Sequence, residues 1–288
     1  MKTFRDRVAV VTGGASGIGR AMAERFATEG MKVVLADIES AALAATEAEM
    51  KAAGASVLSV RIDVAKAAEI EALARKTLSA FGAVHIVCNN AGVASTPVPC
   101  WEQSVADWEW VMGVNLWAVI HGIRVFVPIL LHQKAEGHVV NTASVAGLTS
   151  SPYMSPYNVT KHGVVTLSEC LHLELAAAGA AVKVSVLCPA WVNTRIGDSA
   201  RNRPMSEETD PLLSSSQTQL AGAIRKFIAE GIPPQAVAQR VLDAIRDEQF
   251  WILTHPDFKP MIEDRAAGIV AERNPQSAAP IVGSPKVR

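Results

Sequence analysis

Two side chains with complementary acid-base chemistry stand four residues apart near the middle of the sequence. Tyr157 and Lys161 share one face if this segment is helical. A free phenol has a pKa of about 10, which is high for a base near neutral pH, but an ammonium one turn away favours the phenolate. Such a pair can move a proton to or from a substrate oxygen. The same spacing also occurs by chance in solvated helices, so it needs support from elsewhere in the chain.

Two further polar residues fall where they could assist such a proton transfer. Ser144 follows a predicted buried strand and could hold a substrate oxygen beside the phenol, where it would share the charge that develops. Asn115 is polar within an apolar helical stretch, between Val114 and Leu116. A place at the site and a solvent-facing position on an amphipathic helix both remain open for Asn115.

A glycine-rich turn, TGGASGIG at residues 12–19, lies between a predicted strand and a predicted helix. Glycines in such a turn let backbone N–H groups approach a pyrophosphate, and the helix N-terminus adds partial positive charge. Any tight connection from strand to helix also uses glycines, so the turn alone is weak evidence. Asp37 strengthens it, because it follows the next strand, where a carboxylate can accept both ribose hydroxyls of an adenosine.

The same carboxylate bears on the choice of cofactor. Asp37 would repel the 2′-phosphate of NADP, and neither Ser16 nor Ile38 supplies a basic group to bind it. NAD is therefore favoured over NADP, although a simple N-cap for the following helix is the other explanation of Asp37. Two further turns, Asp63-Val64 and Asn90-Ala91-Gly92, follow predicted strands at the edge where an open α/β sheet binds its ligand.

The elements that must position these residues follow from the spacing of apolar side chains. Short apolar runs predict seven buried strands, at residues 7–11, 31–36, 57–62, 84–88, 138–141, 182–187 and 250–253. Helical patterns between them include 67–81, 105–131, 157–178 and 234–246. This alternation predicts an α/β fold with a doubly wound, parallel, seven-stranded sheet in a Rossmann-type three-layer sandwich.

The predicted sheet organises residues 1–288 as a single domain. Residues 195–232 are polar, contain Pro and Ser, and show weak periodicity, which predicts a mobile substrate-loop insertion. From about residue 256 the pattern fades, and an irregular C-terminal tail is expected.

The composition excludes several classes of protein. With 27 Lys and Arg against 28 Asp and Glu, the formal charge of -1 offers no basic field for nucleic acid or anionic lipid. The longest apolar run, 125–131, contains Pro128 and is too short to span a membrane, and the N-terminus lacks a signal-peptide core. The four cysteines show no C-x-x-C spacing, and three lie in apolar patterns typical of buried, reduced thiols. We expect a cytoplasmic protein without a metal site.

These motifs together resemble those of the short-chain dehydrogenase/reductase family. The match covers about residues 5–255 and includes TGGASGIG at 12–19, NNAG at 89–92, YNVTK at 157–161 and PAWVNT at 189–194. Ala190 departs from the glycine that the family usually has after this proline. The resemblance implies a catalytic set of Asn115, Ser144, Tyr157 and Lys161. It implies cofactor contacts from Gly13, Ser16, Gly17, Ile18, Gly19, Asp37, Ile38, Asp63, Val64, Asn90, Ala91, Gly92, Tyr157, Lys161, Pro189, Val192 and Thr194.

The resemblance also implies a role for each catalytic residue. Tyr157 would transfer the proton, Lys161 would lower its pKa and hold the nicotinamide ribose, and Ser144 would position the substrate oxygen. Asn115 would anchor a water that links Lys161 to solvent. The implied activity is hydride transfer between NAD(H) and a secondary alcohol or ketone. The implied assembly is a homo-oligomer, either a dimer or a tetramer, built through helices 105–131 and 157–178.

The loops expected to select the substrate are mostly small or apolar. Residues 93–101 and 145–156 contain no Arg or Lys, which favours a neutral, bulky aryl or polycyclic alcohol or ketone. The insertion contains Arg195, Arg201 and Arg203, so a small or acidic hydroxy compound remains open. Four tryptophans within 101–117 fit an aromatic pocket or, as we expect, a face packed on another subunit. A non-catalytic NAD-binding regulator is a further alternative, which a broken Ser-Tyr-Lys set would mark.

Overall fold

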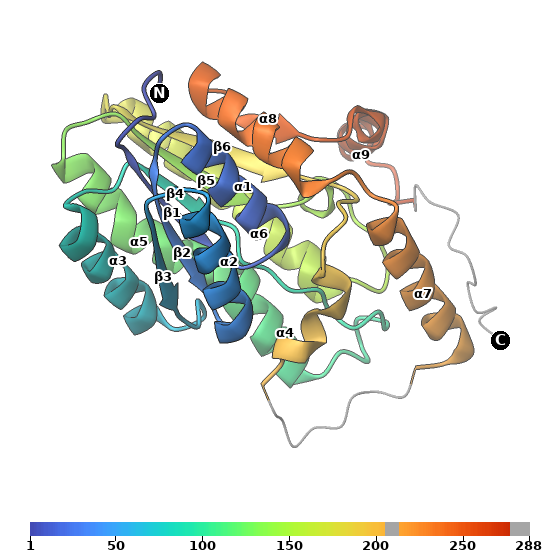
Figure 1. Cartoon of the computed structure of the whole chain (residues 1–288). Coiled ribbons are helices and arrows are strands. Elements are labelled where there is room, and N and C mark those ends of the chain that lie inside the picture. Colours follow the sequence, from blue (N-terminus) through green and yellow to red (C-terminus); the bar gives the residue numbers. More distant parts are fainter. Residues whose placement is uncertain (205–212, 277–288) are drawn as a thin grey trace.

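The computed structural model describes residues 1–204 and 213–276, in which a central sheet is flanked by helices (Figure 1). The seven strands of this described part are β1 (Val8–Thr12), β2 (Lys32–Asp37), β3 (Val57–Arg61), β4 (Ile86–Asn89), β5 (Gly137–Thr142), β6 (Val182–Cys188) and β7 (Trp251–Leu253). They lie in the order β3-β2-β1-β4-β5-β6-β7, and every neighbouring pair is parallel. The predicted doubly wound, Rossmann-type sheet is confirmed.

The strand order reverses at β1, which pairs with β2 on one side and with β4 on the other. Connections from these strands leave toward opposite faces, so a crevice opens at their carboxyl ends. The strands β1, β2 and β4 end at Thr12, Asp37 and Asn89, and a turn follows each of them. The topology therefore brings the glycine-rich turn, Asp37 and the NNAG segment to one edge of the sheet.

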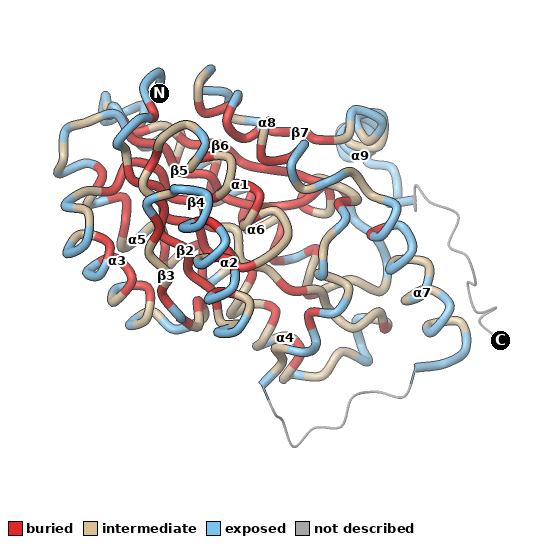
Figure 2. The backbone as a smooth tube through the Cα atoms, in the orientation of Figure 1, coloured by how far each residue is buried: buried red, intermediate tan, exposed pale blue. Residues whose placement is uncertain are grey.

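Helices cover both faces of the sheet because neighbouring strand residues point in opposite directions. Val33 packs in one core with α1 (Gly17–Thr28), α2 (Ser40–Ala52) and α8 (Pro234–Asp247). Val34 packs in the other with α3 (Ala67–Phe81), α5 (Ala118–His132) and α6 (Ser155–Ala177). Figure 2 shows the buried backbone concentrated in the strands between these two helical layers. The fold is thus a three-layer sandwich.

One long helical stretch runs through α4 (Val105–Met112), a π turn (Gly113–Trp117) and α5. By length and composition alone, residues 105–132 would suffice to cross a membrane. That is weak evidence, because a core helix of a soluble protein meets the same criterion. Here α5 packs its buried face, including Phe126 and Leu130, onto the sheet.

Two segments are more regular than their sequences predict. The expected mobile insertion, 195–232, contains a 3-10 helix (Ile196–Asn202, here η3) and α7 (Ser215–Ala229). Between them, residues 205–212 lie outside the described residues. A capping box between Ser214 and Gln217 starts α7, a local signal that the weak apolar periodicity hid.

The prediction of an irregular tail from about residue 256 is wrong for residues 256–270. A 3-10 turn (Pro256–Phe258, here η4) leads into α9 (Lys259–Val270), and residues 277–288 lie outside the described residues. No residue of α9 is buried, as its exposed backbone in Figure 2 also shows. A helix without a buried stripe leaves no apolar period in the sequence, which is why it escaped prediction.

The cysteines also differ in part from expectation. Cys88 and Cys188 are buried in β4 and β6, whereas Cys100 and Cys170 are exposed. Cys170 lies on the outward side of α6, so its apolar neighbours in sequence do not enclose it. The prediction that three of the four thiols are buried is therefore wrong for Cys170.

Candidate active site

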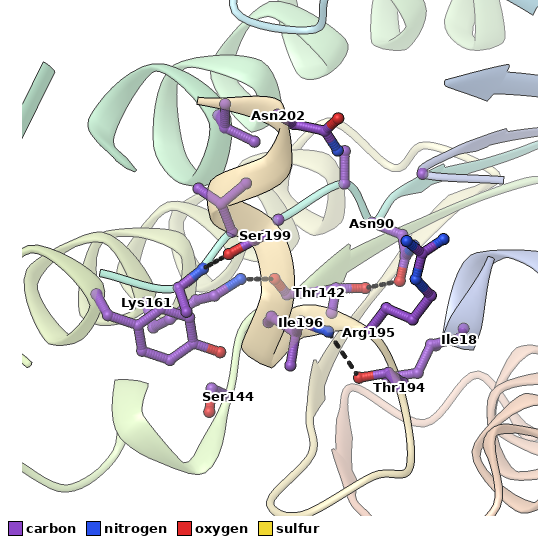
Figure 3. Close-up of a pocket in the computed structure, with 18 of the residues that line it drawn as sticks. Ile18, Asn90, Thr142, Ser144, Lys161, Thr194, Arg195, Ile196, Ser199 and Asn202 are labelled. Carbon is purple, nitrogen blue, oxygen red and sulfur yellow. Dashed lines mark hydrogen bonds between the residues drawn. The ribbon is translucent and has the colours of Figure 1, made fainter. Parts of the chain in front are cut away.

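A cavity of about 690 Å³ opens at the carboxyl edge of the sheet, where the crevice was expected. It is bordered by the turns after β1, β2 and β4, by α6, and by η3 and α7 of the insertion. Figure 3 shows side chains from several of these segments, among them Asn90, Lys161 and Ser199, around one space. All the residues proposed from the sequence line this cavity except Gly19 and Asn115.

The glycine-rich turn leaves the start of α1 open to the cavity. Gly13 and Gly17 have φ angles of 66° and 53°, which favour glycine. Ser16 occupies the N-cap position but its side chain makes no capping hydrogen bond. The first N–H groups of a helix lack partners within the helix, so this uncapped end fits an anionic pyrophosphate.

Gly19 supports the turn from behind rather than facing the cavity. A Cβ at this position would lie 2.1 Å from the Gly13 carbonyl oxygen and 2.6 Å from Asn90 Nδ2. Neither distance is possible for a real Cβ, so only glycine lets α1 approach the turn this closely. Its role is to allow the shape of the phosphate cradle.

Asp37 ties the end of β2 to the glycine-rich turn. Its Oδ2 accepts a hydrogen bond from Ala15 N–H at 3.0 Å, and its Oδ1 accepts one from Glu39 N–H at 3.0 Å. Each carboxylate oxygen can accept more than one hydrogen bond, so both keep capacity for ribose hydroxyls. The two backbone bonds hold the carboxylate in place at the cavity wall.

The NNAG segment is fixed to the turn by Thr12. The Thr12 hydroxyl accepts hydrogen bonds from Asn90 N–H at 2.9 Å and from Ala91 N–H at 3.1 Å. Asn90 Nδ2 donates back to the Thr12 carbonyl oxygen at 3.0 Å, and Thr142 donates to Asn90 Oδ1 at 3.2 Å. The loops after β1, β4 and β5 are thereby locked into one wall.

Asn115 is fully buried, so a solvent-facing position is excluded. It lies in the π turn between α4 and α5, a distortion that often marks functional positions. Its Oδ1 accepts from Val93 N–H at 2.8 Å and its Nδ2 donates to the Val93 carbonyl at 2.9 Å. Asn115 therefore clamps the loop that follows Gly92 from beneath the cavity.

Ser144, Tyr157 and Lys161 all line the cavity, on its β5 and α6 side. Ser144 Oγ donates to the Pro189 carbonyl at 3.2 Å. Lys161 Nζ donates to the Thr142 carbonyl at 2.9 Å (Figure 3). The same nitrogen lies 5.5 Å from the centre of the Tyr157 ring. The arrangement presents a phenol, a hydroxyl and an ammonium to one space.

The pKa of Tyr157 is shifted in the opposite direction to the one expected from the sequence. Burial raises the pKa of Tyr157 above its usual value, and hydrogen bonding to Ser144 opposes that rise. Burial lowers the pKa of Lys161 to about 8. Lys161 Nζ, which donates to the Thr142 carbonyl, does not reverse the rise in the Tyr157 pKa. Desolvation dominates, and it keeps the phenol protonated at neutral pH.

Several wall residues could not be identified from the sequence. Phe258 and Met261 reach the cavity from η4 and α9, and Ile224 and Ile228 reach it from α7. Trp110 lines the cavity too, so one of the four tryptophans belongs to an aromatic wall rather than to an outer face. None of these residues belongs to a sequence motif, and only the folded structure shows that they line the same cavity as Tyr157.

Gly147 is a second kind of residue that the motifs missed. It ends a 3-10 turn that starts directly after Ser144 (Val145–Gly147, here η2), and a Cβ there would lie 2.5 Å from the Lys161 carbonyl oxygen. The loop that carries Ser144 is thus packed directly on the helix that carries the tyrosine and the lysine. A glycine within a loop gives no sequence signal for such a contact.

Comparison with known proteins agrees with this site. The short chain dehydrogenase family matches residues 7–204. A protein of Lactiplantibacillus plantarum named CLA biosynthesis dehydrogenase/reductase is 36% identical over 278 residues, 96% of this chain and 97% of the relative. The 1-deoxy-11-beta-hydroxypentalenate dehydrogenase of Streptomyces exfoliatus is 34% identical over 265 residues, 91% of this chain and 88% of the relative.

A crystal structure is similar over nearly the full length. It is a short chain dehydrogenase/reductase from Burkholderia phymatum in complex with NAD, with 45% identity and a TM-score of 0.94. The match covers 97% of this chain and 100% of that one. The likeness therefore extends beyond residues 7–204, the part that the family match covers.

Proposed function

The chain belongs to the short-chain dehydrogenase/reductase family, and from that premise we propose an NAD-dependent enzyme that interconverts a bulky, neutral secondary alcohol and its ketone. The observation that carries the proposal is the convergence of Ser144, Tyr157 and Lys161 on a cavity that also contains the glycine-rich turn and Asp37. Such a cavity can hold a dinucleotide and place a substrate oxygen beside a phenol.

The chain's own residues would handle the proton and the orientation. Bound NAD would supply the hydride acceptor for the alcohol, and bound NADH the donor for the ketone. Tyr157 would donate its proton to the ketone oxygen, or take the hydroxyl proton in the reverse direction. Ser144 would donate a hydrogen bond to the same oxygen, and Lys161 would bind the nicotinamide ribose. Because burial holds Tyr157 in the protonated form, alcohol oxidation should accelerate as the pH rises.

Asp37 supports NAD over NADP as the cofactor. Its carboxylate is held at the cavity wall by two backbone N–H groups, where it would meet the adenosine ribose. A 2′-phosphate there would face a fixed negative charge. The similar Burkholderia phymatum protein is in complex with NAD, which agrees with this preference.

The pairing of the insertion's arginines supports a neutral substrate. Arg201 pairs with Glu39, Arg195 lies 3.7 Å from the same carboxylate, and Arg203 lies 3.6 Å from Asp107. Each guanidinium thus already faces a carboxylate of the chain, although Arg195 and Arg201 share Glu39. An acidic substrate would have to displace one of these partners, which costs part of the binding energy.

A set of apolar side chains in the cavity wall supports a bulky substrate. Its side chains are large and apolar, and they come from α4, the loop before α6, α7 and η4–α9: Trp110, Met154, Ile224, Ile228, Phe258 and Met261. A small alcohol would leave much of this surface uncovered. The relative named for 1-deoxy-11-beta-hydroxypentalenate is a dehydrogenase of a hydroxy compound, which fits the same reaction class.

A panel of secondary alcohols tests the proposal. Small, aryl, polycyclic and carboxylate-bearing alcohols are each offered with NAD and with NADP, and NADH or NADPH formation is followed by absorbance. We expect turnover with NAD and a bulky neutral alcohol. A preference for the small or carboxylate-bearing alcohols would replace the substrate part of the proposal, and no turnover with any member would oppose the reaction class.

Exposed apolar side chains support a homo-oligomer. Trp117 and Val159 are both 49% exposed, and Leu173 is 66% exposed, on the outer sides of the π turn and α6. Large apolar side chains in such positions are typical of subunit interfaces. We propose a dimer or tetramer through these helices in the cytoplasm, and light scattering that reports a monomer at micromolar concentration would contradict the assembly.

A further inference from the structure

A second carboxylate lies beside Asp37 and binds the insertion across the cavity. Glu39 accepts hydrogen bonds from Arg201 Nε at 3.0 Å and from Asn202 Nδ2 at 3.0 Å, and Arg201 also donates to it through a second nitrogen. Arg195 Nη1 lies 3.7 Å from the other oxygen of Glu39. Three groups separated from Glu39 by more than 150 residues of chain thus converge on one side chain.

This cluster adjoins Asp37, the carboxylate proposed to bind the adenosine ribose. Asp37 Oδ1 accepts a hydrogen bond from the N–H of Glu39 itself, so the two carboxylates are held next to each other. Asp37, Glu39, Arg195 and Arg201 all line the same cavity. Two guanidinium groups therefore stand close to the place where a 2′-hydroxyl or a 2′-phosphate would lie.

Without Glu39, Arg195 and Arg201 would favour the binding of NADP, which carries the 2′-phosphate. A guanidinium binds phosphate oxygens through two parallel hydrogen bonds, and a 2′-phosphate carries up to two negative charges. Arg201 is also fixed in place, because its Nη1 donates to the carbonyls of Arg195 at 3.0 Å and Asp198 at 2.9 Å. The Asp37 charge alone would then face two nearby cations.

We propose that Glu39 is a second determinant of NAD over NADP, acting by engaging Arg195 and Arg201 so that neither binds a 2′-phosphate. The inference rests on the proposed function, since it concerns the choice of dinucleotide. Hydrogen bonding to Arg201 is the largest effect that holds the pKa of Glu39 below its usual range, so the carboxylate is ionised at neutral pH. Arg195 and Arg201 could bind a 2′-phosphate, and their pairing with Glu39 prevents this.

Substitution of Glu39 by glutamine tests this role. Titration of the Glu39→Gln protein with NADH and NADPH, followed by cofactor fluorescence, should show about tenfold tighter NADPH binding than in the wild type. NADH affinity should change less than about threefold. Glu39→Ser is a second variant, because Glu39 is the N-cap residue of α2 and serine is a favoured N-cap that should preserve folding.

Two controls separate the role from a general effect of charge. Glu49→Gln removes the same charge from another arginine-paired carboxylate, on α2 outside the cavity, and should leave both affinities unchanged. Adding Arg201→Gln to Glu39→Gln should remove most of the gain in NADPH affinity. Both changes are measured by binding, so they do not depend on finding the substrate.

The outcomes for the inference and for the proposed function are distinct. If wild type binds NADH tightly and neither Glu39 variant gains NADPH affinity, the role of Glu39 is refuted while NAD use stands. The same holds if Glu49→Gln gives an equal gain. If wild type itself prefers NADPH, the cofactor assignment of the proposed function fails.

Discussion

Replacing Gly147 by alanine should separate the two halves of the proposed catalytic set. An added Cβ would lie 2.5 Å from the Lys161 carbonyl oxygen and 2.8 Å from its carbonyl carbon. Ordinary van der Waals contact begins near 3.4 Å, so the η2 loop and α6 must move apart by about 0.9 Å. Both atoms belong to the backbone of α6, so no side-chain rotation can relieve the clash.

That displacement acts directly on the proposed reacting groups. η2 follows Ser144 immediately, whereas α6 holds Tyr157 and Lys161, so the movement changes the distance between the hydroxyl and the phenol. A misplacement of about 1 Å can reduce catalysis by about 100-fold. Overpacking of this kind also costs about 1–3 kcal/mol of stability. We therefore expect kcat of Gly147→Ala to fall by about 100-fold in a protein that still folds.

The assay compares three measurements on the wild type and the variant. These are kcat with the best alcohol of the panel, NADH affinity by fluorescence, and the melting temperature. NADH affinity should fall much less than kcat, because of the proposed cofactor contacts only Tyr157 and Lys161 lie on α6, whereas the glycine-rich turn and Asp37 belong to β1 and β2 and are not displaced. Gly268→Ala is the matched control, since a Cβ there meets only Arg273, at 3.7 Å and beyond, on the exposed helix α9. Wild-type kcat in Gly147→Ala with an unchanged melting temperature would refute the reasoning.

Two further properties follow from the same structure. Burial lowers the pKa of His138 to about 3 and that of His85 to about 4. Below about pH 6.5 the unfolded chain therefore binds more protons than the folded chain. The free energy of unfolding should fall by up to about 1.4 kcal/mol per pH unit for each histidine, down to about pH 4. Urea unfolding at pH 7 and pH 4.5 measures this loss, which His138→Gln should reduce, and equal stability of the wild type at both pH values would contradict it. Phe258→Ala removes a large apolar wall from the cavity, so kcat/KM should fall about tenfold for a bulky alcohol and less than twofold for a small one. Equal losses for the two alcohols would show that Phe258 does not contact the bulky substrate.

The sheet was predictable because parallel strands are buried on both faces and appear in the sequence as short apolar runs. The run that contains Val33 and Val34 marks β2, and the pattern over 67–81 matches α3 at both ends. α9 was not predictable, because it buries no residue and so has no apolar period. The strength of an element's apolar pattern depends on how much of it the core covers.

The site was predictable where its residues lie within one turn of each other along the chain. Tyr157 and Lys161 fall on one helix face, and the glycine-rich turn is continuous in sequence. The burial of Asn115 depends on a π turn, which local propensity does not encode. The pairing of Glu39 with Arg201 and the entry of Phe258 into the cavity join distant segments, and only the folded chain brings them together.

The proposed NAD-dependent alcohol oxidation depends most on Tyr157 as the group that would transfer the proton. The direct test is the turnover of Tyr157→Phe with NAD and the best alcohol, measured beside its affinity for NADH. Loss of the hydroxyl should lower kcat by about 10²- to 10⁴-fold, the range of general acid-base catalysis, while NADH binding stays within about threefold of the wild type. A Tyr157→Phe protein that turns over at the wild-type rate would contradict the central claim.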